Sequence, residues 1–202
     1  MFPRTAGTEE QRPGSWKLNV SSVLSTDEQF YRLCSDNPDL RLELSKEGRL
    51  IVTSPTGSET GRKNGRITQR LANWSDQDGS GVCFDSSAGF TLPNGAKRSP
   101  DAAWVRREVW ESLSDKQRSE YAPVSPAFVI ELRSPSDSLA ELQSKMAEYI
   151  ETGTLLGWLF DPLNRKVYVY RPEHEPECLE NPSSLSGDPV LPGFTFDPSE
   201  IW

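Results

Sequence analysis

The chain has 202 residues, 35% of them hydrophobic, which is enough for one folded domain with a sizeable core. Its formal net charge is −8, which argues against binding nucleic acid by charge alone, although a local basic patch could still do so. A single histidine excludes sites built on several histidines, including a serine triad and most catalytic zinc sites.

Three cysteines without a CxxC pair favour a reduced protein, and the cytoplasm is the expected location. The N-terminus lacks the pattern of a signal peptide, and no apolar run approaches the ~20 residues that span a bilayer. We therefore expect no membrane partner.

The first half of the chain predicts a leader, a helix, a hairpin and a longer helix. Residues 1–16 are polar and rich in Pro and Gly, and we interpret them as a mobile leader before a domain at 17–202. Ser25 and Glu28 have the spacing of a capping box, which predicts a short helix. Alternating leucines at 40–44 and the apolar run 50–52 predict a hairpin, and a helix is expected over 58–75.

The second half alternates strands with helical segments. Strands are expected at 82–84, 89–92, 101–105 and 128–132, with a charged helical insert at 106–121. A helix should run to about residue 151, with Ser138 and Glu141 as a second capping box, followed by strands at 155–160 and 167–170. This order predicts a single α/β domain with a central mixed β-sheet flanked by helices.

Two of these strands carry one acid each. Asp101 precedes the apolar run Ala-Ala-Trp-Val, and Glu131 lies inside Phe-Val-Ile-Glu-Leu. Burying a carboxylate is costly unless it is paired, hydrogen-bonded or bound to a metal. Magnesium prefers oxygen ligands and keeps several waters, so these two acids could hold it, with the carbonyl of Leu132 as a third oxygen. A divalent cation so placed favours phosphodiester hydrolysis.

The motifs around these acids resemble those of a known family. The sequence contains Pro-Asp at 100–101 and Glu-Leu-Arg at 131–133, which is similar to the PD-(D/E)XK motif of the restriction-endonuclease-like superfamily. The wider pattern resembles the Uma-two family of small restriction endonucleases over residues 25–202. It comprises Ser54-Pro55, Ser-Pro-Ser at 134–136, Lys145 with Tyr149, Gly-Trp-Leu-Phe-Asp-Pro at 157–162 and Leu-Pro-Gly-Phe at 191–194.

The resemblance implies a restriction-endonuclease-like fold and Mg²⁺-dependent cleavage of DNA, for which Mn²⁺ could substitute. It also implies a further acid from the first core helix, which maps to Glu59, and a possible homodimer. Glu43 is a rival for that role, but alternation along its strand predicts an outward position. Asp161 is expected in a turn.

The chain departs from the motif at its lysine, because position 133 is Arg. Arginine stays charged and cannot act as a base, so Arg133 is expected to stabilise charge on phosphate, or to pair with Glu131. Lys145 is the candidate for the ammonium role, and a solvent-exposed helix position is its alternative. The leading hypothesis is a Mg²⁺-dependent endonuclease. The alternatives are a catalytically inactive module that binds nucleic acid or a partner protein, and a structural dimer.

Overall fold

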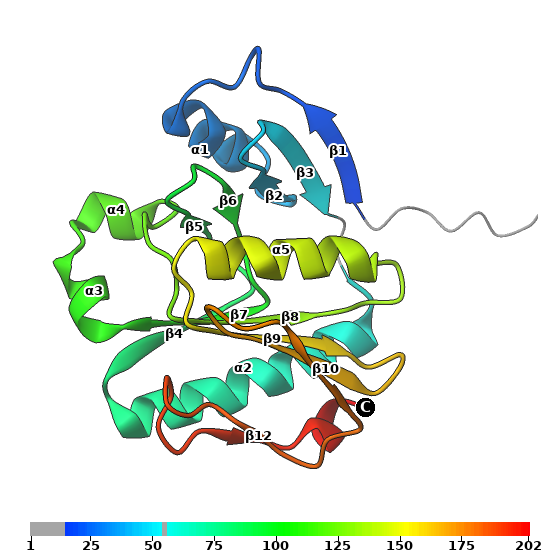
Figure 1. Cartoon of the computed structure of the whole chain (residues 1–202). Helices are drawn as coiled ribbons and strands as arrows, with labels where there is room; N and C mark the ends of the chain where they lie inside the picture. The colour runs from blue at the N-terminus through cyan, green and yellow to red at the C-terminus, as the bar shows by residue number, and fades with distance from the viewer. Residues whose placement is uncertain (1–14, 54–55) are drawn as a thin grey trace, which may run out of the picture.

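A six-stranded mixed sheet forms the centre of the computed structural model, which describes residues 15–53 and 56–202 (Figure 1). Its strands follow the order β11-β10-β9-β8-β7-β4, in which β8 and β9 are parallel and the other neighbours antiparallel. Their bounds are β4 (Gly81–Asp85), β7 (Ala102–Arg106), β8 (Phe128–Leu132), β9 (Leu156–Asp161), β10 (Lys166–Tyr170) and β11 (Glu177–Glu180).

A second, antiparallel sheet has the order β1-β3-β2-β6-β5. Its strands are β1 (Ser15–Asn19), β2 (Arg41–Leu44), β3 (Arg49–Thr53), β5 (Phe90–Thr91) and β6 (Lys97–Arg98). The pairing of β2 with β3 confirms the predicted hairpin. Ser15 and Trp16, which the sequence assigns to the leader, lie in β1 opposite β3. Residues 1–14 of that leader, and Ser54-Pro55 of the motif pattern, lie outside the described residues.

Helices cover both faces of the six-stranded sheet (Figure 1). α5 (Leu139–Glu151) lies between this sheet and the smaller one, and α2 (Ser58–Asp78) packs against the opposite face. The remaining elements are α1 (Asp27–Asp36), α3 (Arg107–Ser112), α4 (Asp115–Ser119), β12 (Leu185–Ser186), β13 (Thr195–Phe196) and the 3₁₀ helix η1 (Pro198–Ile201). This arrangement confirms the predicted single α/β domain with a central mixed sheet flanked by helices.

The central strands are apolar on both faces because helices cover both. Phe128 and Ile130 of β8 pack in the cluster that contains Ile67 of α2, whereas Val129 packs with Met146 of α5. Successive side chains of a strand point to opposite faces. Glu131 therefore faces α5, on the same side as Val129.

Two predicted capping boxes differ in the structure. At α1 the box is formed by Thr26 and Gln29, one residue later than predicted, because the Gln29 side chain accepts the N–H of Thr26 at 3.1 Å. At α5, Ser138 is the N-cap but its side chain makes no capping bond, and Glu141 forms an ion pair with Lys17 of β1 instead. A contact between distant elements has replaced a local one.

The second helix is longer than the predicted 58–75 and continues to Asp78. Gly79 ends it with a φ of 73°, a left-handed conformation that glycine adopts without steric cost. Within residues 15–53 and 56–202, no helix combines the length and the apolar composition that crossing a bilayer requires.

Candidate active site

Asp101 and Glu131 lie on neighbouring strands of the six-stranded sheet. Asp101 directly precedes β7, and its backbone N–H donates to the Ile130 carbonyl at 3.0 Å. Its carboxylate Oδ2 accepts the N–H of Leu132, the last residue of β8, at 2.8 Å. Asp101 is therefore tied to the strand that carries Glu131. The structure brings together the two acids that the sequence singles out.

Glu131 is buried, with only 3% of its surface exposed. Its Oε1 accepts the hydroxyl of Tyr149 at 3.1 Å and lies 2.8 Å from the ammonium of Lys145. Burial, assisted by the charges of Asp101 and Glu43 and opposed by Lys145, raises the pKa of Glu131 to about 7. A carboxyl that exchanges its proton near neutral pH is typical of functional sites.

The Lys145 ammonium lies between two buried carboxylates. Its Nζ is 2.8 Å from Oε1 of Glu131 and 2.8 Å from Oε1 of Glu43, and it also donates to the Ser99 carbonyl at 3.3 Å. Burial acts to lower the pKa of Lys145, but the two carboxylates outweigh it and the pKa is raised. A raised pKa favours the protonated ammonium, which suits charge stabilisation. The alternative of a solvent-exposed helix position is wrong, because the side chain is only 14% exposed.

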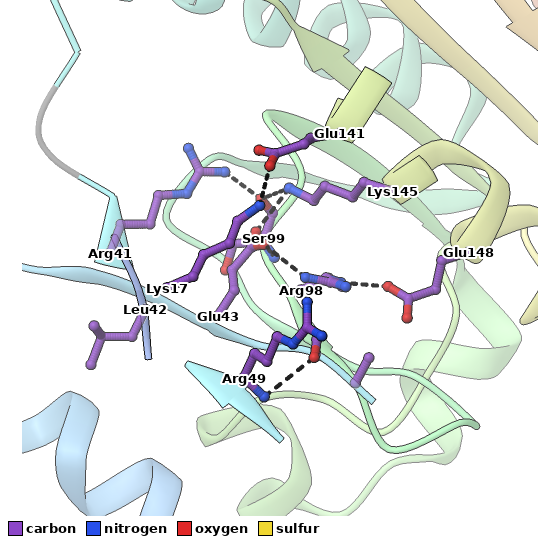
Figure 2. A network of polar contacts seen from close by, with 12 residues as sticks. Lys17, Arg41, Leu42, Glu43, Arg49, Arg98, Ser99, Glu141, Lys145 and Glu148 are labelled. Atoms are coloured by element: carbon purple, nitrogen blue, oxygen red, sulfur yellow. Dashed lines mark hydrogen bonds and ion pairs between the residues drawn. The ribbon is translucent and has the colours of Figure 1, made fainter. Parts of the chain in front are cut away.

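Glu43 is a member of the site that sequence reasoning misplaced. It is 5% exposed rather than outward, and its carboxylate accepts from the Ser99 N–H at 2.9 Å and from Lys145. Arg98 lies 3.4 Å from its other oxygen and also contacts Glu148 (Figure 2). Burial acts to raise the pKa of Glu43, but the three neighbouring cations prevail and lower it to about 2. Glu43 is therefore a permanent anion that fixes Lys145.

The misplacement has a tertiary cause. Leu42 and Leu44 pack with Phe30 of α1, so alternation correctly turns Glu43 to the opposite face of the smaller sheet. That face meets α5 rather than solvent (Figure 1). The alternating pattern Leu-Arg-Leu-Glu-Leu at 40–44 carries no signal for this, unlike the continuous apolar run that identified Glu131.

Arg41 is a second residue that sequence reasoning missed. Its Nη1 donates to Oδ1 of Asp101 at 3.1 Å, and its Nη2 donates to the Ser99 carbonyl. Arg41 and Lys145 reach the region around Ser99 from opposite sides of the site (Figure 2). Burial acts to lower the pKa of Arg41, but the neighbouring carboxylates, Asp101 foremost, raise it. Asp101 therefore has a cationic partner in place.

Arg133, at the position of the motif lysine, pairs with Asp161 rather than with one of the two central acids. Its Nη1 donates to Oδ2 of Asp161 at 3.0 Å, and its Nε donates to the Asp137 carbonyl at 3.3 Å. Asp161 begins the predicted turn, because its carbonyl accepts the Asn164 N–H at 3.2 Å, but it also ends β9 and is fully buried. This pair fastens the segment between β8 and α5. The expected pairing of Arg133 with Glu131 is not among the ion pairs of the described residues.

Glu59 lies in the first turn of α2, as predicted, and lines the same cleft as the central acids. Its side chain is 66% exposed and pairs with Arg62 on its own helix at 2.7 Å. The Arg62 hydrogen bond lowers the pKa of Glu59. Among the described residues, the acid that joins Glu131 at the Lys145 ammonium is Glu43, whereas Glu59 pairs with Arg62.

The site opens into a cleft of about 1770 Å³ that is lined by residues of the smaller sheet, of α5 and of the first turns of α2. Lys17 of β1 and Glu141 of α5 form an ion pair between its walls (Figure 2). Among the side chains that line the cleft, carboxylates outnumber Lys and Arg by ten to six. A cleft with this balance attracts cations and repels a bare phosphate.

The donor set fits a hard cation that needs few protein ligands. No group of three or more His, Cys, Asp or Glu side chains in the described part of the chain is arranged to hold a metal ion. Magnesium needs fewer, because it keeps waters and takes one or two carboxylates. Oε2 of Glu131 accepts no hydrogen bond from any described residue and is not fully enclosed, so a cation in the cleft could reach it.

Two of three comparisons with known proteins found a match. The family model Uma2, described as “Putative restriction endonuclease”, matches residues 27–199. A solved structure, described as “Crystal structure of a putative nuclease belonging to DUF820 from Anabaena variabilis ATCC 29413”, is similar with a TM-score of 0.70 and 20% identity, covering 87% of this chain and 96% of that chain. At this identity the likeness shows the fold. The search of curated proteins found no match.

Proposed function

The chain belongs to the Uma2 family, and on that premise we propose that it is a divalent-metal-dependent nuclease that hydrolyses phosphodiester bonds, with DNA as its substrate. The observation that carries the proposal is the convergence of Asp101 and Glu131 beside the Lys145 ammonium in one cleft. The raised pKa of Glu131 supports it, because burial disfavours the charged carboxylate and a bound cation would offset that cost.

Asp101 and Glu131, with the carbonyl of Leu132, would hold Mg²⁺, for which Mn²⁺ could substitute. Bound there, the ion would neutralise the phosphate and lower the pKa of a water. The excess of carboxylates in the cleft makes such a cation necessary for any approach of a nucleic acid.

Lys145 is proposed to stabilise negative charge that develops on the phosphate, since it remains protonated. Glu43 is proposed as its positioning residue, because it fixes the ammonium from the smaller sheet at 2.8 Å. Arg133 is proposed to hold the segment between β8 and α5 through Asp161. Glu59 could assist only from the mouth of the cleft, where it is exposed.

DNA as substrate rests on the description of the family and on the phosphate chemistry of the site. A homodimer belongs to the same proposal, and light scattering of the purified protein tests it. The cytoplasmic location rests on the cysteine content.

The test is cleavage of supercoiled plasmid and of labelled oligonucleotides in the presence of Mg²⁺ or Mn²⁺. Asp101→Asn keeps an acceptor for the Leu132 N–H, so it should fold normally and lose cleavage. Asp36→Asn changes the same charge on an exposed residue of α1 and should retain it. Thermal unfolding confirms that both variants are folded. Cleavage that survives Asp101→Asn would contradict the proposed site.

The alternative is a module of the same fold that has lost catalysis and binds nucleic acid or a partner protein. The observation that favours it is that Arg133 stands at the position of the motif lysine and forms an ion pair with Asp161. Calorimetric titration separates the two. Heat of Mn²⁺ binding that disappears in Asp101→Asn supports the nuclease, whereas no heat and no cleavage of any DNA supports the alternative.

A further inference from the structure

Arg41 occupies one oxygen of an acid that the proposed function assigns to a metal ion. The side chain comes from the first residue of β2, crosses to the six-stranded sheet and donates to Oδ1 of Asp101 at 3.1 Å. The other oxygen of Asp101 is held by the Leu132 N–H. The Arg41 contact is therefore the one that a cation at Asp101 would compete with.

The guanidinium has donors to spare and access to the cleft. It offers five N–H groups, of which the described contacts to Asp101 and Ser99 use two. Its side chain is 33% exposed, whereas that of Asp101 is 14% exposed. Arg41 also lines the cleft. A planar group with free donors facing a cleft is suited to two oxygens of a phosphate.

Other arginines near the acids lack this combination. Arg98 is 8% exposed and is held between Glu43 and Glu148. Arg133 is held by the fully buried Asp161. Arg41, by contrast, is paired with a partly exposed acid whose charge another cation could take over.

We propose that Arg41 is a further catalytic residue, which neutralises Asp101 until a divalent cation binds there and then contacts the phosphate of the substrate. The inference rests on the proposed function, because it takes Asp101 as a metal-binding acid. In the free protein, Arg41 and the cation would compete for the Asp101 carboxylate. In the complex with substrate, both would contact the phosphate. Loss of the guanidinium should therefore have opposite effects on metal affinity and on cleavage.

The first measurement is calorimetric titration of the full chain with Mn²⁺. Arg41→Met should bind Mn²⁺ about tenfold more tightly than wild type, because the competing charge is gone. Arg49→Met is the matched control. Arg49 lines the same wall of the cleft but makes no described contact with Asp101, so its loss should change the affinity less than about threefold. In an Asp101→Asn background, Arg41→Met should not restore Mn²⁺ binding.

The second measurement is the single-turnover cleavage rate of a labelled oligonucleotide at saturating Mn²⁺. Arg41→Met should be slower by about a hundredfold, the scale of losing one donor to transition-state charge. Arg41→Lys keeps the charge but not the fork of donors. It should bind Mn²⁺ with nearly wild-type affinity and recover only part of the rate. Thermal unfolding shows whether each variant is folded. If Arg41→Met is unfolded, the cleavage rate of Arg41→Lys is compared with that of wild type instead.

The outcomes separate the inference from the proposed function. Wild type that binds no Mn²⁺ contradicts the proposed function and, with it, the exchange at Asp101. Wild type that binds Mn²⁺ while Arg41→Met binds it equally or more weakly overturns the inference alone. Tighter binding with an unchanged cleavage rate also overturns it, since Arg41 would then be only a counter-ion. Tighter binding in a protein that cleaves nothing supports the competition at Asp101 and contradicts the nuclease.

Discussion

The Glu131→Gln substitution tests the electrostatics of the site without depending on any substrate. The native protein raises the pKa of Glu131 from 4.5 to about 7, so between these values the folded state binds a proton that the unfolded state has lost. The free energy of unfolding must then fall as pH rises from about 4.5 through about 7. The full effect is on the order of 3 kcal/mol, since each pKa unit corresponds to about 1.4 kcal/mol.

Glutamine removes this titration and keeps an acceptor for the Tyr149 hydroxyl. The assay is urea denaturation of both proteins in EDTA from pH 4.5 to pH 8. Any constant cost of weakening the contact with Lys145 cancels when the difference between the two proteins is followed against pH. Wild type should lose about 3 kcal/mol relative to Glu131→Gln across this window.

The control is Glu141→Gln, which alters an exposed carboxylate of α5 paired with Lys17. Its difference from wild type should stay nearly constant over the same window. A constant difference for Glu131→Gln would mean that Lys145 fully offsets the burial of Glu131. A wild type that gains stability over the variant as pH rises would mean that the pKa of Glu131 is lowered, and either result would refute the reasoning.

Three further substitutions test an ion pair and the packing around the six-stranded sheet. Arg133→Met should destabilise the protein by about 3 kcal/mol, because it leaves the buried Asp161 without its cation, yet Mn²⁺ affinity should stay at the wild-type value. A large loss of Mn²⁺ affinity in a folded Arg133→Met protein would show that Arg133 acts at the acids after all. Gly81→Ala should cost about 1–3 kcal/mol in urea denaturation, because its Cβ would lie 2.1 Å from the indole of Trp104. Gly65→Ala, in open space on α2, should stabilise by up to about 1 kcal/mol, and equal effects of the two would contradict the packing argument.

Much of the fold was predictable because local patterns determine it. Alternation identified the hairpin of β2 and β3, and continuous apolar runs identified β8 and β9, which helices cover on both faces. The capping boxes were less predictable, since several donors and acceptors near a helix start can satisfy the same groups. At α5 the acid of the predicted box is bound by Lys17, more than a hundred residues away.

The central acids were visible in the sequence because Asp101 directly precedes an apolar run and Glu131 interrupts one, and burial there must be compensated. Two residues that complete the site were harder to predict. Arg41 and Glu43 reach the site only because the face of the smaller sheet that carries them lies toward α5 rather than toward solvent (Figure 1). That arrangement depends on packing between sheets, which no local pattern of β2 encodes.

The position of the ammonium follows from the geometry of α5. Lys145 and Tyr149 are four residues apart, so they lie on the same face of the helix, and both contact Oε1 of Glu131. Arg133 lies two residues beyond Glu131, where its neighbour on the parallel strand β9 is the buried Asp161, which takes its charge. Under the proposed function a lysine on the strand is unnecessary, because the helix that covers this face already places the Lys145 ammonium beside the acids. The arginine at the motif position is compatible with catalysis for that reason, and Lys145 is the cation whose loss catalysis should not survive.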